Sequence, residues 1–176
     1  MHRKHLTRLG LGFLFLAAPL AAQTAPVGRT AYNSVYLELG GNALVYSVNY
    51  ERMMPTGTAF RAGLSYMSVS ATSGTAAANA NVVGIPLTFS YLGRGTGSVK
   101  LELGAGATFE KFSGSSSVGF GSDIKAGAFV PLATFIAGLR IAPPKGGFNF
   151  KLAFTPFYHP DIGFFPWGGM SFGMSF

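Results

Sequence analysis

Large apolar residues alternate with small or polar residues along most of the chain from residue 34 onward. At the C-terminus, Met170, Phe172, Met174 and Phe176 occupy every second position, and glycine or serine stands between them. Successive side chains of a β-strand point to opposite sides, so a strand with this pattern has one apolar face and one polar face. The alternation therefore predicts strands.

The same alternation, interrupted by glycine, proline, asparagine and serine, predicts eight strands. We expect them at residues 34–40, 44–51, 60–66, 83–91, 99–110, 133–141 and 148–155, followed by a final strand that ends at residue 176. An even number of antiparallel strands is typical of bacterial membrane barrels. The expected fold class is all-β, a closed antiparallel up-and-down transmembrane β-barrel.

The predicted connections alternate in length, as in barrels with short turns on one side of a membrane and longer loops on the other. Longer loops are expected at roughly Ser68–Asn81, Ser113–Ala128 and Pro156–Trp167. The first strand departs from this pattern, because only a Gly-Gly-Asn turn follows it. Within the fourth strand, Pro86 cannot donate a ladder hydrogen bond, which predicts a bulge or a kink.

The two faces of the predicted strands indicate which of them meets lipid. One face consists almost wholly of Val, Leu, Ile, Phe, Tyr, Ala and Met, and Leu44 belongs to it; the other is mainly Ser, Thr, Gly and Asn, with Val45 and Ile136 among them. A soluble barrel would turn its apolar face toward a core and its polar face toward water. All eight charged residues of the strands share the polar face, which we expect to line the lumen: Glu38, Glu51, Arg61, Lys100, Glu102, Glu110, Arg140 and Lys151.

A barrel of eight strands has room inside for side chains and little else. Glu51 and Arg61 flank the Pro55–Gly57 turn as antiparallel neighbours on the inward face, so we expect them to pair. The other inward charges can extend this pair into a ladder. The preferred interpretation is a packed lumen whose charges pair with one another, and the alternative is a gated, narrow ion path.

Aromatic residues gather near the ends of the predicted strands, as in the interfacial belts of membrane barrels. The expected belt residues are Tyr50, Phe60, Tyr66, Tyr91, Phe109, Phe148, Phe154 and Trp167. The loop before the last strand is also rich in aromatic residues. We expect these side chains at the level of the lipid headgroups.

The N-terminal segment has the pattern of a secretory signal. Its first eight residues include three basic ones, Leu9–Leu16 is apolar apart from glycines, and the small residues Ala21 and Ala22 precede the predicted cleavage site. The apolar stretch is shorter than the roughly 20 residues that a membrane-spanning helix needs, and Pro19 interrupts it. We therefore expect a signal peptide at residues 1–22 and a barrel domain at residues 23–176.

Composition argues against several classes of function. After removal of the signal, ten basic and six acidic residues leave a net charge of +4 without any run of Lys or Arg, so nucleic acid is not an expected partner. The chain has no cysteine, which excludes disulfides and thiolate metal sites. His159 is the only histidine of the mature chain, and neither a metal nor a cofactor is expected.

The closing segment Pro166–Phe176, PWGGMSFGMSF, and the strand pattern before it resemble small eight-stranded outer-membrane barrels of the OmpA-like type. The resemblance covers most of the mature chain and implies a place in the bacterial outer membrane, among its lipids and lipopolysaccharide. It also implies that the barrel-assembly machinery recognises the last strand, through the apolar residues Met170, Phe172, Met174 and Phe176. We expect a monomer.

These observations favour a structural or interaction role without catalysis, although barrels of this size serve as anchors, adhesins and lipid enzymes. One alternative is an enzyme acting on outer-membrane lipid, with His159 as base, Asp161 beside it, and a serine that no sequence context identifies. Another alternative is a narrow channel or a conduit for small apolar ligands. A soluble, lipocalin-like carrier fits least well, because its outer face should be polar.

Overall fold

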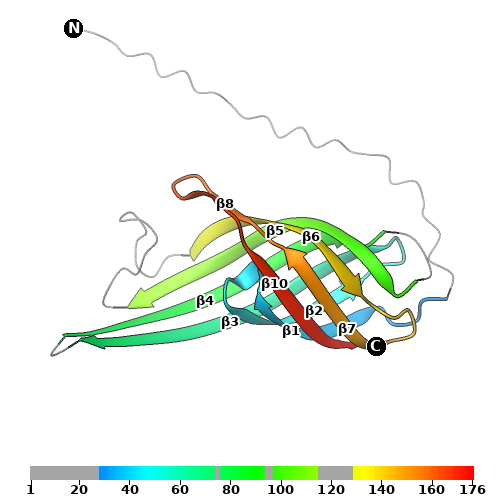
Figure 1. Cartoon of the computed structure of the whole chain (residues 1–176), viewed down its shortest axis with the longest axis horizontal. Helices are drawn as coiled ribbons and strands as arrows, with labels where there is room; N and C mark the ends of the chain where they lie inside the picture. The colour runs from blue at the N-terminus through cyan, green and yellow to red at the C-terminus, as the bar shows by residue number, and fades with distance from the viewer. Residues whose placement is uncertain (1–27, 74–75, 94–96, 115–128) are drawn as a thin grey trace, which may run out of the picture.

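The computed structural model describes residues 28–73, 76–93, 97–114 and 129–176, within which eight antiparallel strands form a closed barrel (Figure 1). The wall consists of β1 (Asn33–Gly40), β2 (Tyr46–Met53), β3 (Thr58–Ser73), β4 (Ala76–Tyr91), β5 (Val99–Gly114), β6 (Phe129–Ile141), β7 (Gly147–Phe154) and β10 (Gly168–Ser175). Neighbouring strands pair in chain order, and β1 pairs with β10 to close the sheet. The predicted eight-stranded, closed all-β barrel is confirmed, while the predicted signal peptide, residues 1–22, lies outside the described residues.

Three short elements stand beside the barrel wall. The 3-10 turn η1 (Gly41–Ala43) connects β1 to β2, and β8 (Phe157–His159) forms a hairpin with β9 (Gly163–Phe165) inside the predicted last loop. β8 also pairs with β6, which attaches the hairpin to the wall. We call the end of the barrel with η1 and this hairpin the hairpin end, and the opposite end, where the chain finishes, the terminal end. In the part of the chain that the structure describes, no helix is long and apolar enough to cross a membrane.

The wall is uneven, because β3 and β4 extend far beyond their neighbours (Figure 1). Each has 16 residues, and their ladder continues to the pair Ser73–Ala76. The predicted loop Ser68–Asn81 is therefore wrong: this stretch lacks a row of large apolar residues, but main-chain pairing does not require one. β5 likewise continues to Gly114, and the remainder of the predicted loop Ser113–Ala128 lies outside the described residues.

Pro86 interrupts the pairing of β3 with β4 without inserting a residue. The ladder has the same register on one side of the interruption, at Ala62–Leu87, as on the other, at Ser65–Gly84. Of the two predicted features, the bulge is therefore absent, and the kink stays a prediction. The pairs between these two points are missing from the ladder, as expected beside a residue that has no amide hydrogen to donate.

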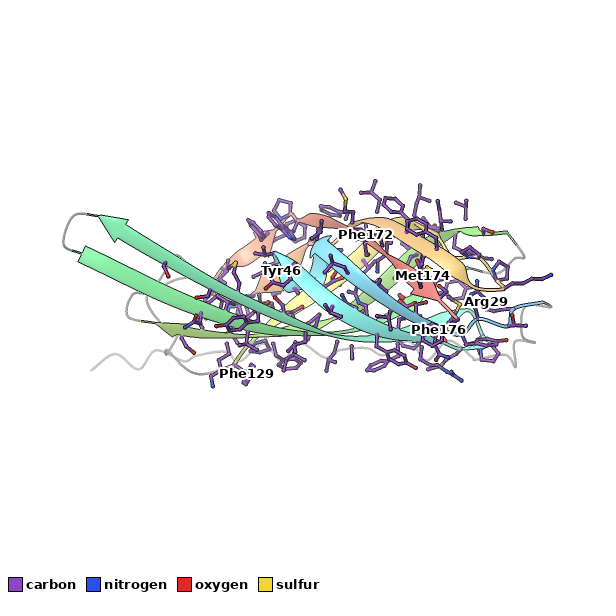
Figure 2. All side chains as sticks on the ribbon, turned by 90° about the horizontal axis from the view of Figure 1, so that it is seen from below. Arg29, Tyr46, Phe129, Phe172, Met174 and Phe176 are labelled. Carbon is purple, nitrogen blue, oxygen red and sulfur yellow. The ribbon has the colours of Figure 1, made fainter. Side chains whose placement is uncertain are left out.

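Side chains on the wall alternate as predicted, with apolar groups outward and polar groups inward. In β2, the outward Tyr46, Val48 and Tyr50 are exposed, while the residues between them are buried. Outward side chains form a fringe around the ribbon in Figure 2. Ile136 is buried on the inward face, where the alternation of its strand placed it.

The start of β2 differs from the prediction that Leu44 faces outward and Val45 inward. Val45 is exposed, whereas Leu44 packs against an apolar cluster of Val130, Leu132 and Phe157. Leu44 has a φ of 67°, a conformation that residues other than glycine rarely adopt. The turn η1 imposes this reversal, and burial of the leucine side chain in the cluster offsets its cost.

The turn η1 depends on a glycine that faces the lumen. Gly41 is buried and has a φ of 67°, and a Cβ on it would overlap the Glu38 carboxylate. An alanine at this position would therefore meet both backbone strain and a steric clash. Gly93 has a similar φ of 65° but no atom within 4 Å of such a Cβ, so it offers a matched control.

We expect Gly93→Ala to lower the free energy of unfolding by about 1–2 kcal/mol, the cost of its backbone conformation alone. Gly41→Ala should lower it by clearly more, because the Glu38 side chain must also move. Urea unfolding in detergent micelles measures both values. Equal losses would show that η1 is not held against Glu38 as the structure has it.

Candidate functional site in the barrel interior

The interior of the barrel contains eight charged residues of the strands and is the candidate site. The eight charged residues predicted for the lumen all point into it, and each is at most 9% exposed. Buried asparagine, threonine and serine residues lie among them. A buried charge without a partner costs several kcal/mol, so their pairing is decisive for stability.

Arg61 on β3 is the centre of a first cluster, near the hairpin end. Its Nη1 lies 2.9 Å from Oε1 of Glu38, and its Nε donates to the hydroxyl of Thr88 at 2.9 Å. Its Nη2 donates to Oδ1 of Asn42 in η1, and the Asn42 amide donates to Thr134 at 2.5 Å. One guanidinium thus joins β1, β3 and β4 to the turn at the hairpin end.

Arg140 on β6 is the centre of a second cluster, nearer the terminal end. Its Nη1 lies 2.5 Å from Glu51 and 3.8 Å from Glu102, and its Nε donates to Oδ1 of Asn149 at 3.2 Å. Nζ of Lys151 lies 3.5 Å from Oε1 of Glu102. Two cations therefore face two carboxylates, and the charges of this cluster balance.

Tyr36 on β1 links the two clusters. Its hydroxyl accepts a hydrogen bond from Nη1 of Arg61 at 3.3 Å and donates one to Oε2 of Glu51 at 3.4 Å. Nζ of Lys151 lies 5.3 Å from the centre of its ring, within the range of a cation–π contact. A single aromatic side chain thus connects charges from three strands.

The predicted pair of Glu51 with Arg61 has the right register but the wrong partners. The two residues are opposite each other in the β2–β3 ladder. Their side chains nevertheless form ion pairs elsewhere, Glu51 with Arg140 and Arg61 with Glu38. In a narrow lumen, a long side chain reaches strands that are not its neighbours in the sheet. The pairing of adjacent strands in the sequence pattern does not reveal such contacts.

Main chain lies across both ends of this charged interior. At the terminal end, the amides of Thr30 and Ala31 donate to the carbonyl of Pro144, and Arg29 donates to the carbonyls of Ala31 and Ala142 at 3.0 Å each. Figure 2 shows Arg29 and Phe176 at this same end of the barrel. At the hairpin end, the carbonyl of Asn42 accepts from Thr108.

Sequence reasoning did not identify Arg29, Tyr36 or Asn42 as members of the site. The unusually short turn after the first strand was the one signal that could have pointed to Asn42. Nothing in the local pattern singles out Arg29, because its partners are carbonyl groups that only the folded chain brings near.

Lys100 and Glu110 lie on β5 at opposite ends of the interior. Lys100 is opposite Arg140 in the β5–β6 ladder, near the terminal end. Glu110 is near the hairpin end, and neither of its carboxylate oxygens has a hydrogen-bond partner within the described part of the chain. Gly84, opposite Glu110 on β4, leaves space for the carboxylate, since a Cβ there would come within 2.7 Å of it.

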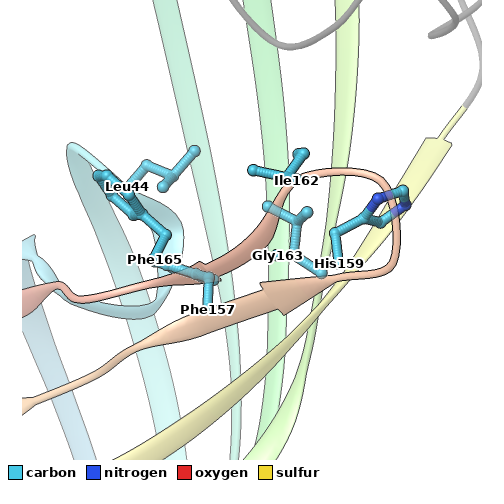
Figure 3. Close-up of a pocket in the computed structure, with 7 residues that line it drawn as sticks. Leu44, Phe157, His159, Ile162, Gly163 and Phe165 are labelled. Carbon is cyan, nitrogen blue, oxygen red and sulfur yellow. The ribbon is translucent and has the colours of Figure 1, made fainter.

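His159 lies at the hairpin end beside a small apolar pocket (Figure 3). Its Nδ1 accepts a hydrogen bond from the amide of Asp161 at 3.3 Å and lies 3.6 Å from that residue's carboxylate. The other residues that line the pocket are Leu44, Leu132, Phe157, Ile162, Gly163 and Phe165, none of which carries a hydroxyl or thiol nucleophile. Over the described ranges, no three His, Cys, Asp or Glu side chains gather so as to hold a metal ion.

The outer surface carries the residues predicted for the C-terminal signal and for the aromatic belt. Met170, Phe172, Met174 and Phe176 are all exposed on β10 and at its end. The predicted belt aromatics are on the outward face, except Trp167. Trp167 instead packs against the apolar cluster at the hairpin end, where its Nε1 donates to the carbonyl of Leu44 at 3.0 Å.

No family model and no curated protein matches this sequence. Among solved structures, the N-terminal β-barrel domain of Pseudomonas aeruginosa OprF is similar, with a TM-score of 0.49 and 12% identity over 81% of this chain and 94% of that one. The strand order and register of the chain itself show the fold, independently of this distant structural similarity.

Mutagenesis can distinguish the observed ion pair of Arg61 with Glu38 from the predicted pair of Arg61 with Glu51. We expect Arg61→Met to destabilise the barrel by about 3–5 kcal/mol, because it leaves Glu38 buried without a cation. In double-mutant cycles, Arg61→Met should couple strongly with Glu38→Gln and clearly less with Glu51→Gln. Urea unfolding in micelles gives both coupling free energies, and a larger value for Glu51 would contradict the pairing described above.

Proposed function

We propose that the protein is a non-catalytic β-barrel of the outer membrane of a two-membrane bacterium, with a structural or interaction role. The observation that carries this proposal is the reversed polarity of the barrel. Large apolar side chains such as Val48 and Leu152, both 57% exposed, cover the outside, and eight charged residues of the strands are buried inside. Water disfavours such an outer surface, and the hydrocarbon core of a membrane favours it.

The filled interior supports a role that does not depend on a wide pore. Two charge clusters and the tyrosine between them occupy the lumen, and main chain lies across each end. A barrel of this strand number has little room beyond its side chains. We infer a rigid membrane-embedded scaffold whose exposed elements at the hairpin end make the contacts.

The same proposal includes the route and the surroundings of the protein. Export would use the signal segment, residues 1–22, and the barrel-assembly machinery would recognise the exposed apolar residues of the last strand. The hairpin end would face the outside of the cell and contact lipopolysaccharide. The outward aromatic residues would lie at the lipid headgroups, as in other membrane barrels. We propose that the barrel acts as a monomer.

Cell fractionation and gel migration test the proposed location. We expect the protein in outer membranes, with unboiled samples migrating faster than boiled ones because the barrel resists detergent. Val48→Arg, in the middle of β2, should cost about 2–4 kcal/mol of stability in lipid, whereas Met54→Arg, beside the turn after β2, should cost at most about 1 kcal/mol. A soluble periplasmic protein that tolerates or gains from Val48→Arg would overturn the proposal.

A role of Phe176 in recognition by the assembly machinery can be distinguished from its contribution to the stability of the folded barrel. Phe176 and Phe148 are both outward aromatics at the terminal end, 62% and 58% exposed. We expect Phe176→Ala to lower the amount of folded protein in cells severalfold while leaving refolding in lipid vesicles close to that of Phe148→Ala. Immunoblots of outer membranes and gel-shift refolding assays measure the two effects. Equal levels of both variants in cells would contradict recognition of Phe176.

A further inference from the structure

The part of β3 that extends beyond the wall has a neighbour on one side only. On the side of β2, the ladder ends at the pair Val48–Leu64, and none of the described strands pairs with β3 beyond this point. On the side of β4, pairing continues to Ser73–Ala76. Figure 1 shows both strands extending past the rest of the barrel. We call Ser65–Ser73 on its β2 side the free edge of β3.

The register identifies the main-chain groups that point to this free edge. Within a strand, the N–H and C=O of successive residues point alternately to the two neighbouring strands. The carbonyl of Thr58 accepts from the amide of Met54 on the β2 side, and the carbonyl of Tyr66 accepts from the hydroxyl of Tyr46 on β2. Even-numbered residues of β3 therefore point their main-chain groups toward the β2 side. Beyond Tyr66, these residues are Ser68, Ser70 and Thr72.

The sequence of the free edge does not protect it from pairing with another strand. Proteins commonly protect a strand edge with lysine, with other charged residues or with proline. Residues 62–83 include neither a charged residue nor a proline. The side chains of Ser68 and Ser70 are small and exposed. The free edge is therefore open to a further strand, whose main chain supplies alternating donors and acceptors at the matching spacing.

A second copy of the same edge fits these requirements. In an antiparallel pair with a two-fold axis at Ser70, this residue is opposite its own copy, and Ser68 is opposite Thr72. All three residues that point to the free edge then exchange main-chain hydrogen bonds with the other copy. Like charges directly opposite each other destabilise a strand pair, and an edge without charges avoids this repulsion when it pairs with itself.

We propose that two copies of the chain pair through the free edge of β3 where two outer membranes face each other. Strands of a membrane barrel tilt by about 35–45°, so two copies in one membrane would cross their β3 strands at twice this angle, about 70–90°. Antiparallel alignment instead requires that one copy be inverted, as copies in two facing membranes are. The inference rests on the proposed function for placing the hairpin end outside the cell, and each barrel remains a monomer in its own membrane.

Cysteine cross-linking of the full barrel in detergent tests the pairing and its register, because the chain has no cysteine of its own. Ser70→Cys and Ser68→Cys are matched variants, two residues apart on the same face of β3. With copper phenanthroline as oxidant, we expect Ser70→Cys to form disulfide-linked dimers at least tenfold faster than Ser68→Cys. Two copies of Ser70 would have Cα atoms about 5.5 Å apart, within the range of a disulfide. Two copies of Ser68 would be offset by about 13 Å along the strands, outside that range.

Gel migration before boiling verifies that each cysteine variant is folded. Equal rates for the two variants would show only random collisions and would overturn the pairing. A faster rate for Ser68→Cys would equally overturn the register about Ser70.

Aggregation of mixed cells tests the contact between membranes. Two populations with different fluorescent labels express the full chain and carry lipopolysaccharide without its long sugar chains, which would hold the membranes apart. We expect mixed aggregates only when both populations carry the protein. Ser70→Lys should reduce aggregation at least tenfold, because it places two lysines opposite each other. Asn81→Lys should reduce it by less than twofold, because it adds the same charge on β4, which is paired on both sides at this residue.

Three results would overturn the contact between membranes. No aggregation would contradict the pairing, and equal effects of the two lysine variants would contradict the role of the free edge. Mixed aggregates with the protein on one population only would identify a different partner. None of these results would alter the fractionation result, so this proposal and the proposed function fail separately.

Discussion

Closure of the sheet between its first and last strands is the interaction on which the rest of the structure depends. β1 and β10 are paired without interruption from Ser34–Ser175 to Gly40–Gly169. This ladder removes the free edges that an open sheet would have at its first and last strands, where it would invite association with other chains. It also separates an inside from an outside, so that the two faces of every strand acquire different surroundings.

Once the barrel is closed, its narrow interior determines how the charges pair. Arg61 and Arg140 lie on opposite parts of the wall, and each finds a carboxylate on a strand that is not its neighbour. Tyr36 joins the two groups through its hydroxyl. The buried pairs join strands that are not neighbours, and loss of any one partner would leave a buried charge without a counter-charge.

The two ends of the barrel are built differently. At the terminal end, the segment before β1 lies against the turn between β6 and β7. Main-chain hydrogen bonds to Pro144 and the side chain of Arg29 hold the two together. At the hairpin end, the long strands β3 and β4 extend beyond the other strands of the wall. The apolar cluster and the pocket also lie at this end, and Glu110 is opposite Val130 of the cluster.

Period-two alternation by itself determined the eight strands, their inward and outward faces, and the burial of the eight charged residues predicted for the lumen, because side-chain direction along a strand is a local property. It failed at Ser68–Asn81, where main-chain pairing extends a strand that has no apolar face, and at Leu44, where a tight turn reverses the alternation. Only the tertiary structure decided which charges meet, since the partners of Arg61 and Arg140 lie across the lumen. It also left Glu110 without a partner among the described residues, because the space beside it is shaped by Gly84 and Val130 on other strands.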